Sequence, residues 1–152
     1  MEVTIKKLHE DALPPIQGSL HSAGYDLFAY SDVTIPAYGS VKVSTGIAIG
    51  WSDPLVYLQL ASRSGLFIQN GITCEGGVID WDYLQEIIVL MQNHTPDQYE
   101  IKKGQRICQG IFLMRPMIQR FAIVTDWISP GQSYLPLPSM QIRYGGLGST
   151  GK

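Results

Sequence analysis

The fold of this chain is constrained most by a succession of short apolar segments, each cut off by residues that favour turns. Apolar and polar residues alternate over residues 3–5 and again over residues 41–49. A period of two is typical of half-buried strands. Further strands are predicted at residues 55–60, 86–92, 99–102, 107–114 and 121–124.

The segments between these strands carry turn chemistry, with proline, glycine and aspartate at Pro14-Pro15, Thr95-Pro96-Asp97 and Lys103-Gly104. Only residues 63–69 read as a helix, and it is short. Many short strands separated by roughly 8 to 12 residues indicate a sandwich, a jelly roll or a barrel. We therefore predict an all-β fold with one short helix.

The composition changes near the C-terminus. Prolines and then glycines dominate from Ser129 onward, which predicts one β domain over residues 1–128 and an extended C-terminal arm over residues 129–152. Residues 146–152 fit the pattern G-x-x-x-x-G-K, but a P-loop needs a following helix, so that fold is not expected. Main-chain N–H groups of the glycines, together with the hydroxyls of Ser149 and Thr150, could still donate hydrogen bonds to phosphate oxygens. A flexible glycine tail is the alternative interpretation.

Charge and cysteine usage exclude several classes of protein. The net charge of −2 argues against a nucleic-acid partner, which would need several lysine or arginine contacts to phosphate. No apolar run approaches the roughly 18 to 20 residues that cross a bilayer, so no membrane partner is expected. Cys74 and Cys108 lack metal-site or redox spacing, which favours free thiols in a reducing, intracellular compartment, the cytoplasm or nucleus.

Residues 76–83, Gly-Gly-Val-Ile-Asp-Trp-Asp-Tyr, combine two glycines, a carboxylate and an aromatic ring. Val78 and Ile79 read as the end of a buried strand, with Asp80 and Tyr83 together at its tip. The preceding glycines would leave main-chain N–H and C=O groups open to a planar ligand. A β-hairpin with an acidic turn is the alternative.

Three other segments are candidate polar sites. Arg63 and Ser64 suit a phosphate, although a serine here could equally cap the helix. Arg106 and Gln109 form a second cluster of this kind. Asp26 stands at the start of a short strand, where it could hold a metal-bound water or simply cap a turn.

The order of these segments resembles the trimeric dUTPase family. Its five motifs are matched by Ala23-Gly24-Tyr25-Asp26-Leu27, Arg63-Ser64-Gly65-Leu66, Gly77-Val78-Ile79-Asp80-Trp81-Asp82-Tyr83, Lys103-Gly104-Gln105-Arg106-Ile107-Cys108-Gln109 and Gly145-Gly146-Leu147-Gly148-Ser149-Thr150-Gly151. The resemblance implies a jelly-roll-like β-barrel, a homotrimer with active sites shared between subunits, and a C-terminal arm that closes a neighbouring site. It also implies hydrolysis of dUTP to dUMP and pyrophosphate with Mg²⁺.

The same resemblance implies roles for individual residues. Asp80 would be the general base for water attack on the α-phosphate, and Tyr83 would pack on the deoxyribose. Main-chain groups around Gly77 and Ile79 would read uracil. Asp26 would hold Mg²⁺ through water. The residues expected at the phosphates are Arg63, Ser64, Gly65 and Gln109, and those expected to close over the substrate from the arm are Arg143, Leu147, Gly148, Ser149 and Thr150.

Two other functions remain open at the level of sequence. Leu84 and Gln85 replace an Arg-Gly pair of the family, and Leu147 replaces a phenylalanine, so a non-catalytic adaptor derived from a dUTPase, as among viral relatives, is one alternative. A dCTP deaminase would need an acid within the strand at residues 86–92, which has only Glu86 at its start. The joint presence of Asp26, Arg63 and Asp80 favours the hydrolase.

Overall fold

A computed structural model describes residues 1–118, which form two larger antiparallel sheets facing each other and a third sheet of two strands. The first sheet has the strand order β1 (Val3–Lys7), β5 (Ser40–Trp51), β9 (Glu86–Asn93) and β7 (Ile72–Glu75). The second has the order β2 (Ile16–Gln17), β3 (Tyr25–Phe28), β11 (Arg106–Met114), β6 (Val56–Ser62) and β8 (Val78–Ile79).

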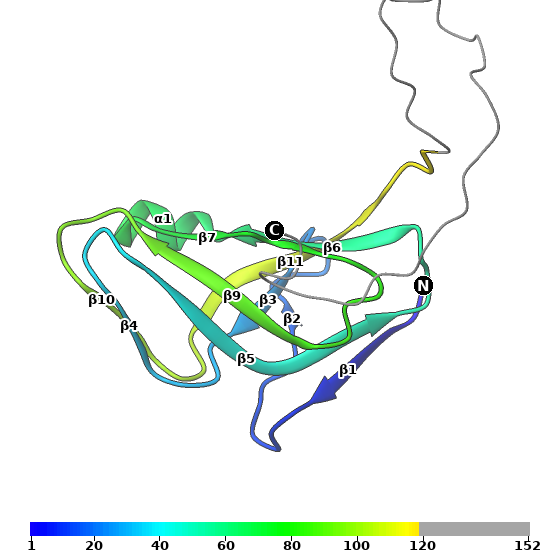
Figure 1. Ribbon diagram of the computed structural model, residues 1–152, viewed down its shortest axis with the longest axis horizontal. Coiled ribbons are helices and arrows are strands. Elements are labelled where there is room, and N and C mark those ends of the chain that lie inside the picture. Colours follow the sequence, from blue (N-terminus) through cyan, green and yellow to red (C-terminus); the bar gives the residue numbers. More distant parts are fainter. Residues whose placement is uncertain (119–152) are drawn as a thin grey trace, which may run out of the picture.

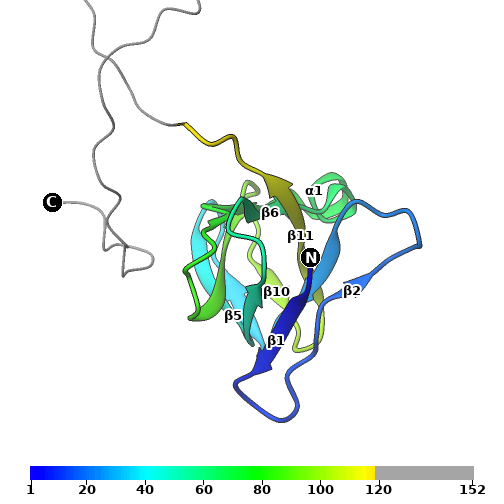
Figure 2. The ribbon, with the colours of Figure 1, turned by 90° about the vertical axis from the view of Figure 1, so that its right-hand side faces the viewer.

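The remaining described elements complete one end of the body. β4 (Val33–Ile35) pairs with β10 (Tyr99–Ile101), and the single described helix α1 (Ser64–Asn70) lies near β7. Figure 1 shows the long strands β5 and β9 side by side, with α1, β4 and β10 at the same end. Viewed after a quarter turn, the strands surround one interior (Figure 2).

The core lies between the two sheets and follows the period of two that the sequence predicts. Along β6, Leu58 and Leu60 are buried whereas Tyr57, Gln59 and Ala61 are only half-buried, because alternate side chains point to opposite faces. The largest fully buried side chains come from all three sheets, among them Leu27, Ile35, Ile47, Leu58, Ile72, Ile87, Met91, Ile101 and Ile107. One continuous core thus supports the ends of β3, β6 and β11.

The all-β fold and the short helix are confirmed, and each strand predicted within residues 1–118 is present. The prediction that Val78 is buried is wrong, since the residue is 59% exposed. It lies in the two-residue edge strand β8, where Ile79 takes the inner face and Val78 the outer one. The predicted strand at 121–124 and the C-terminal arm at 129–152 lie outside the described residues.

Residue Arg63 joins β6 to α1 and begins the helix. It is the N-cap residue, in extended conformation (φ −87°, ψ 122°), and no side chain caps the helix. The idea that Ser62 or Ser64 serves as a helix cap is therefore wrong. The Ser62 hydroxyl instead accepts a hydrogen bond from the Cys74 amide at 2.8 Å and donates one to the Cys74 carbonyl at 3.3 Å, which ties the end of β6 to β7.

Candidate active site

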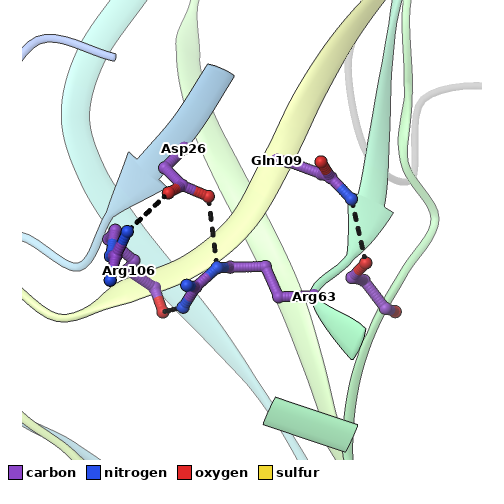
Figure 3. Close-up of polar contacts among 5 residues, drawn as sticks. Asp26, Arg63, Arg106 and Gln109 are labelled. Atoms are coloured by element: carbon purple, nitrogen blue, oxygen red, sulfur yellow. Dashed lines mark hydrogen bonds and ion pairs between the residues drawn. The ribbon is translucent and has the colours of Figure 1, made fainter. Parts of the chain in front are cut away.

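Three strand ends bring one carboxylate and two guanidinium groups together (Figure 3). Asp26 Oδ1 forms an ion pair with Arg63 Nε at 3.1 Å, and its Oδ2 accepts a hydrogen bond from Arg106 Nη1 at 3.1 Å. Arg63 Nη1 also donates to the main-chain oxygen of Arg106 at 3.0 Å. We call these three residues the arginine cluster.

Strand register explains why residues so far apart in sequence meet here. In β3 and β11, Asp26 lies directly opposite Gln109, which lies opposite Ala61 of β6. Gly24 lets β3 come this close, because a Cβ at that position would stand 2.9 Å from Gln109 Oε1 and 3.1 Å from Ile111 Cγ1. Gln109 Nε2 in turn donates to the Ser62 carbonyl at 3.3 Å.

The charge of the cluster suits an anion. Two guanidinium groups share one carboxylate, so a positive charge is left over. The Asp26 side chain is only 14% exposed, whereas those of Arg63 and Arg106 are 27% and 48% exposed. Partly buried arginines with remaining N–H groups bind phosphate oxygens well, because the planar fork matches their geometry.

Ser64 and Gly65 follow Arg63 and are both exposed on the first turn of α1. The first amides of any helix have no partner inside it, so these two residues present N–H groups, and Ser64 a hydroxyl, beside the arginine cluster. The structure thus brings together the predicted residues Asp26, Arg63, Ser64, Gly65 and Gln109. It also shows that Arg106 is a partner of Asp26. From the sequence, Arg106 was recognised only as a polar residue near Gln109.

The glycine pair before Asp80 packs against β6. A Cβ on Gly77 would lie 2.4 Å from the carbonyl oxygen of Leu60, so only glycine fits. The Gly77 carbonyl accepts from Leu60 N at 2.6 Å and from Gln59 Nε2 at 3.2 Å. The expectation of an open carbonyl at Gly77 is therefore wrong, because β6 already uses both of its lone pairs.

The turn that carries Asp80 and Tyr83 is fixed at several points. The Tyr83 amide donates to the Asp80 carbonyl at 3.0 Å, and the Tyr83 hydroxyl donates to the Glu86 carbonyl at 2.8 Å. Trp81 Nε1 donates to the Trp51 carbonyl at 2.9 Å. Burial, and then the charge of Glu86, raise the pKa of Tyr83, so its hydroxyl stays protonated at neutral pH.

The Asp80 carboxylate is exposed and makes no hydrogen bond to any residue between 1 and 118. It is therefore accessible to water and to a ligand. Within a single chain, however, it lies far from the arginine cluster. Ile79 pairs with Leu58, four residues before Ser62, and at about 3.3 Å per residue the backbones of Asp80 and Arg63 are roughly 20 Å apart.

A magnesium ion has only a partial protein site here. Among residues 1–118, no three His, Cys, Asp or Glu side chains gather as a metal site. Asp26 nevertheless fits a water-mediated contact, since each of its oxygens contacts one arginine and keeps a lone pair for a water. Mg²⁺ commonly binds through one carboxylate, water and substrate phosphates, and the residues present are consistent with that mode.

Further predicted site residues cannot be placed. Arg143, Leu147, Gly148, Ser149 and Thr150 lie outside the described residues. Over residues 1–118 the only helix is much too short to cross a membrane.

The fold and these residues define an all-β protein with a basic cluster suited to a phosphorylated ligand and a separate, accessible carboxylate. A family model described as dUTPase matches residues 11–129. The chain therefore belongs to the dUTPase family.

Individual relatives agree over nearly the whole chain. A protein of Yarrowia lipolytica named deoxyuridine 5'-triphosphate nucleotidohydrolase is 36% identical, over 99% of this chain and 90% of its own length. A protein of the same name from Paramecium bursaria Chlorella virus 1 is 40% identical, over 97% and 96% respectively.

Solved structures agree in fold. A variant dUTPase from phage phi11 of S. aureus, described with a structural Mg(II) ion, superposes with a TM-score of 0.75 at 18% identity, over 83% of this chain and 98% of its own. A Staphylococcus bacteriophage 80alpha dUTPase variant with dUpNHpp gives a TM-score of 0.76 at 21% identity, over 84% and 99%. Both comparisons establish the fold of this chain.

Proposed function

We propose that this chain hydrolyses dUTP to dUMP and pyrophosphate in active sites shared between the subunits of a homotrimer. One observation carries the proposal. The dUTPase fold of this chain presents both an arginine cluster with a net positive charge and a separate, exposed carboxylate, Asp80. The named relatives, 36% and 40% identical over nearly the whole chain, support the reaction.

Each half of the site has its own part in the reaction. Arg63, Ser64, Gly65 and Gln109 hold the phosphates, and Asp80 takes the proton of the water that attacks the α-phosphorus. A positioned base of this kind contributes about 10²- to 10⁴-fold to the rate. Mg²⁺, held by the phosphates and through water by Asp26, would neutralise charge that develops on the phosphate oxygens.

Substrate selection falls to the segment between Gly77 and Tyr83. Main-chain groups of this segment other than the Gly77 carbonyl read the edge of uracil, and a cytosine would mismatch their donors and acceptors. The Tyr83 ring packs on the deoxyribose. Its orientation is fixed by the hydrogen bond from its hydroxyl to the Glu86 carbonyl, so it can exclude a 2′-hydroxyl.

The distance between the two halves supports a shared site. Asp80 and Arg63 of one chain stand roughly 20 Å apart along β6, which a single nucleotide bound at the arginine cluster does not span to reach the reacting water. The complete site therefore takes Asp80 from one chain and the arginine cluster from another.

The outer face of the second sheet supports the same assembly. Residues paired across β2, β3, β11, β6 and β8 share this face with Asp26 and Gln109. Its apolar members are Ile16, Tyr57, Val78, Ile111 and Leu113, and Ile16, Val78 and Leu113 are 46%, 59% and 39% exposed. A second copy that covers this apolar face would bring its own Asp80 beside the cluster. The C-terminal arm, residues 129–152, would then close the site through Arg143, Leu147, Gly148, Ser149 and Thr150.

The free thiols support a reducing compartment. Cys74 and Cys108 are both free and buried, as is usual where glutathione keeps thiols reduced. We place the reaction in the cytoplasm or nucleus of the cell or host cell.

The reaction is tested by pyrophosphate release from dUTP with Mg²⁺, with dTTP, dCTP and UTP as comparison substrates. Release from dUTP alone supports the proposal. No turnover of any nucleotide would refute it and would favour the adaptor.

Sharing of sites is tested by mixing two inactive variants, Asp80→Asn and Arg63→Ala, after joint unfolding and refolding. If each site draws on two chains, about a quarter of the sites in an equimolar mixture recover both residues, and activity returns to that level. No recovery would mean that both residues act within one chain.

A further inference from the structure

Arg106 reaches Arg63 by two separate routes. Its side chain binds Asp26 Oδ2 at 3.1 Å, while the other oxygen of the same carboxylate binds Arg63 Nε. Its main-chain oxygen accepts directly from Arg63 Nη1 at 3.0 Å. Figure 3 shows the closed loop of contacts that results.

This loop fixes the plane of the Arg63 guanidinium. A planar group held at one nitrogen by an ion pair and at another by a hydrogen bond cannot rotate about its stem without losing one of these contacts. The N–H groups that remain then keep a constant direction. Without Arg106, Asp26 would keep only one cationic partner and could turn with the Arg63 side chain.

We propose that Arg106 is a positioning residue for phosphate binding, which holds the Asp26 carboxylate so that Asp26 in turn orients Arg63. This inference rests on the proposed function, and it gives Arg106 a role distinct from that of Arg63 itself. Arg63 contacts the phosphate, whereas Arg106 acts through Asp26.

The chain offers a matched control for this inference. Arg115 lies just beyond the opposite end of β11 and is also exposed. Within residues 1–118 its side chain makes one hydrogen bond, from Nε to the Pro54 carbonyl at 3.1 Å. Arg115→Ala removes the same charge and the same kind of side chain from the segment that directly follows β11. It leaves every contact of the arginine cluster intact.

The test measures kcat and KM for dUTP in Arg106→Ala, Arg106→Lys and Arg115→Ala, together with the melting temperature. We expect Arg106→Ala to lower kcat/KM about tenfold to a hundredfold, as for loss of a charge-assisted hydrogen bond. Arg106→Lys restores the charge at Asp26 and recovers part of the loss. Arg115→Ala leaves kcat/KM unchanged. Equal losses in Arg106→Ala and Arg115→Ala would overturn the proposal, because only general charge would then matter.

A double variant separates positioning from direct phosphate contact. If Arg106 acts through Asp26, Asp26→Asn with Arg106→Ala is no more than about twofold worse than Asp26→Asn alone, since the shared pathway is already broken. Losses that multiply would show that Arg106 contacts the ligand itself and would overturn the proposal.

The affinity for inorganic pyrophosphate, measured by calorimetric titration, tests the role of Arg106 without requiring that the chain hydrolyse dUTP. Weaker pyrophosphate binding in Arg106→Ala but not in Arg115→Ala supports positioning even if the wild-type chain turns over no dUTP. Unchanged pyrophosphate affinity in an active enzyme whose kcat/KM is also unchanged would overturn the role of Arg106 and leave the hydrolase intact.

Discussion

Replacing Gly77 by alanine is expected to disrupt the contact between β8 and β6. The added Cβ would lie 2.4 Å from the carbonyl oxygen of Leu60 and 2.8 Å from its Cβ. A relaxed carbon–oxygen contact is about 3.4 Å, so the backbone must separate by about 1 Å. The hydrogen bond from Leu60 N to the Gly77 carbonyl, now 2.6 Å, would then exceed hydrogen-bond range.

The cost of this change can be worked from its two parts. Loss of the main-chain hydrogen bond costs about 1 kcal/mol, and overpacking against an ordered neighbour costs about 1–3 kcal/mol. The free energy of unfolding should therefore fall by about 2–4 kcal/mol. For a chain of this length the melting temperature falls by about 2–4 °C per kcal/mol, so a decrease of roughly 5–15 °C is expected.

The assay is thermal unfolding by circular dichroism at a fixed chain concentration, because subunit association shifts the transition. Gly65→Ala is the matched control. A Cβ at Gly65 in α1 meets nothing within 4 Å, so the same substitution there should raise stability by up to about 1 kcal/mol. Equal melting temperatures for Gly77→Ala and the wild type would refute the reasoning, since the contact would then be easily relieved.

Three further outcomes are expected. Asp80→Asn should abolish pyrophosphate release while calorimetry still detects binding of dUTP, and an unchanged rate would remove Asp80 as the base. Asn93→Ala should lower the free energy of unfolding in urea by about 3–5 kcal/mol, because the fully buried Asn93 amide donates to Pro36 and Asp97 carbonyls and accepts from Thr95. The raised pKa of Tyr83 stabilises the fold fully below the unfolded value of about 10, and this contribution is lost as pH rises through the folded pKa. Tyr83→Phe should therefore lose less stability than the wild type as the pH rises above about 10.

The long strands could be predicted from sequence because each carries enough alternating residues to reveal a period. The helix was predicted at residues 63–69 and lies at Ser64–Asn70. The two- and three-residue strands β2 and β4 were not predicted, since so few residues cannot show a period of two. Val78 was placed in the core for the same reason, because its side is decided only by pairing with Gln59.

The sequence predicts which residues belong to the site, but not how their side chains are arranged in space. Motif order identified Asp26, Arg63 and Gln109, and strand register then brought them together. The second partner of Asp26 could not be read from the sequence, because Arg106 follows it by 80 positions and meets it only through the pairing of β3 with β11. The hydrogen bonds that the Gly77 carbonyl accepts from β6 likewise could not be predicted, because they depend on a contact between segments that are distant in the sequence.

The pairing of β8 with β6 makes the geometry of the site sensitive to the length of β6. Within one chain, the number of residues along β6 sets the separation between Asp80 and Arg63, at about 3.3 Å per residue. Deleting one residue between Leu58 and Ser62 would shift Arg63 and also turn the following side chains to the other face. Deleting two would keep the faces but shorten the distance by about 7 Å. A deletion within β6 would therefore displace Arg63, whereas a substitution on the outer face of the strand would leave this distance unchanged.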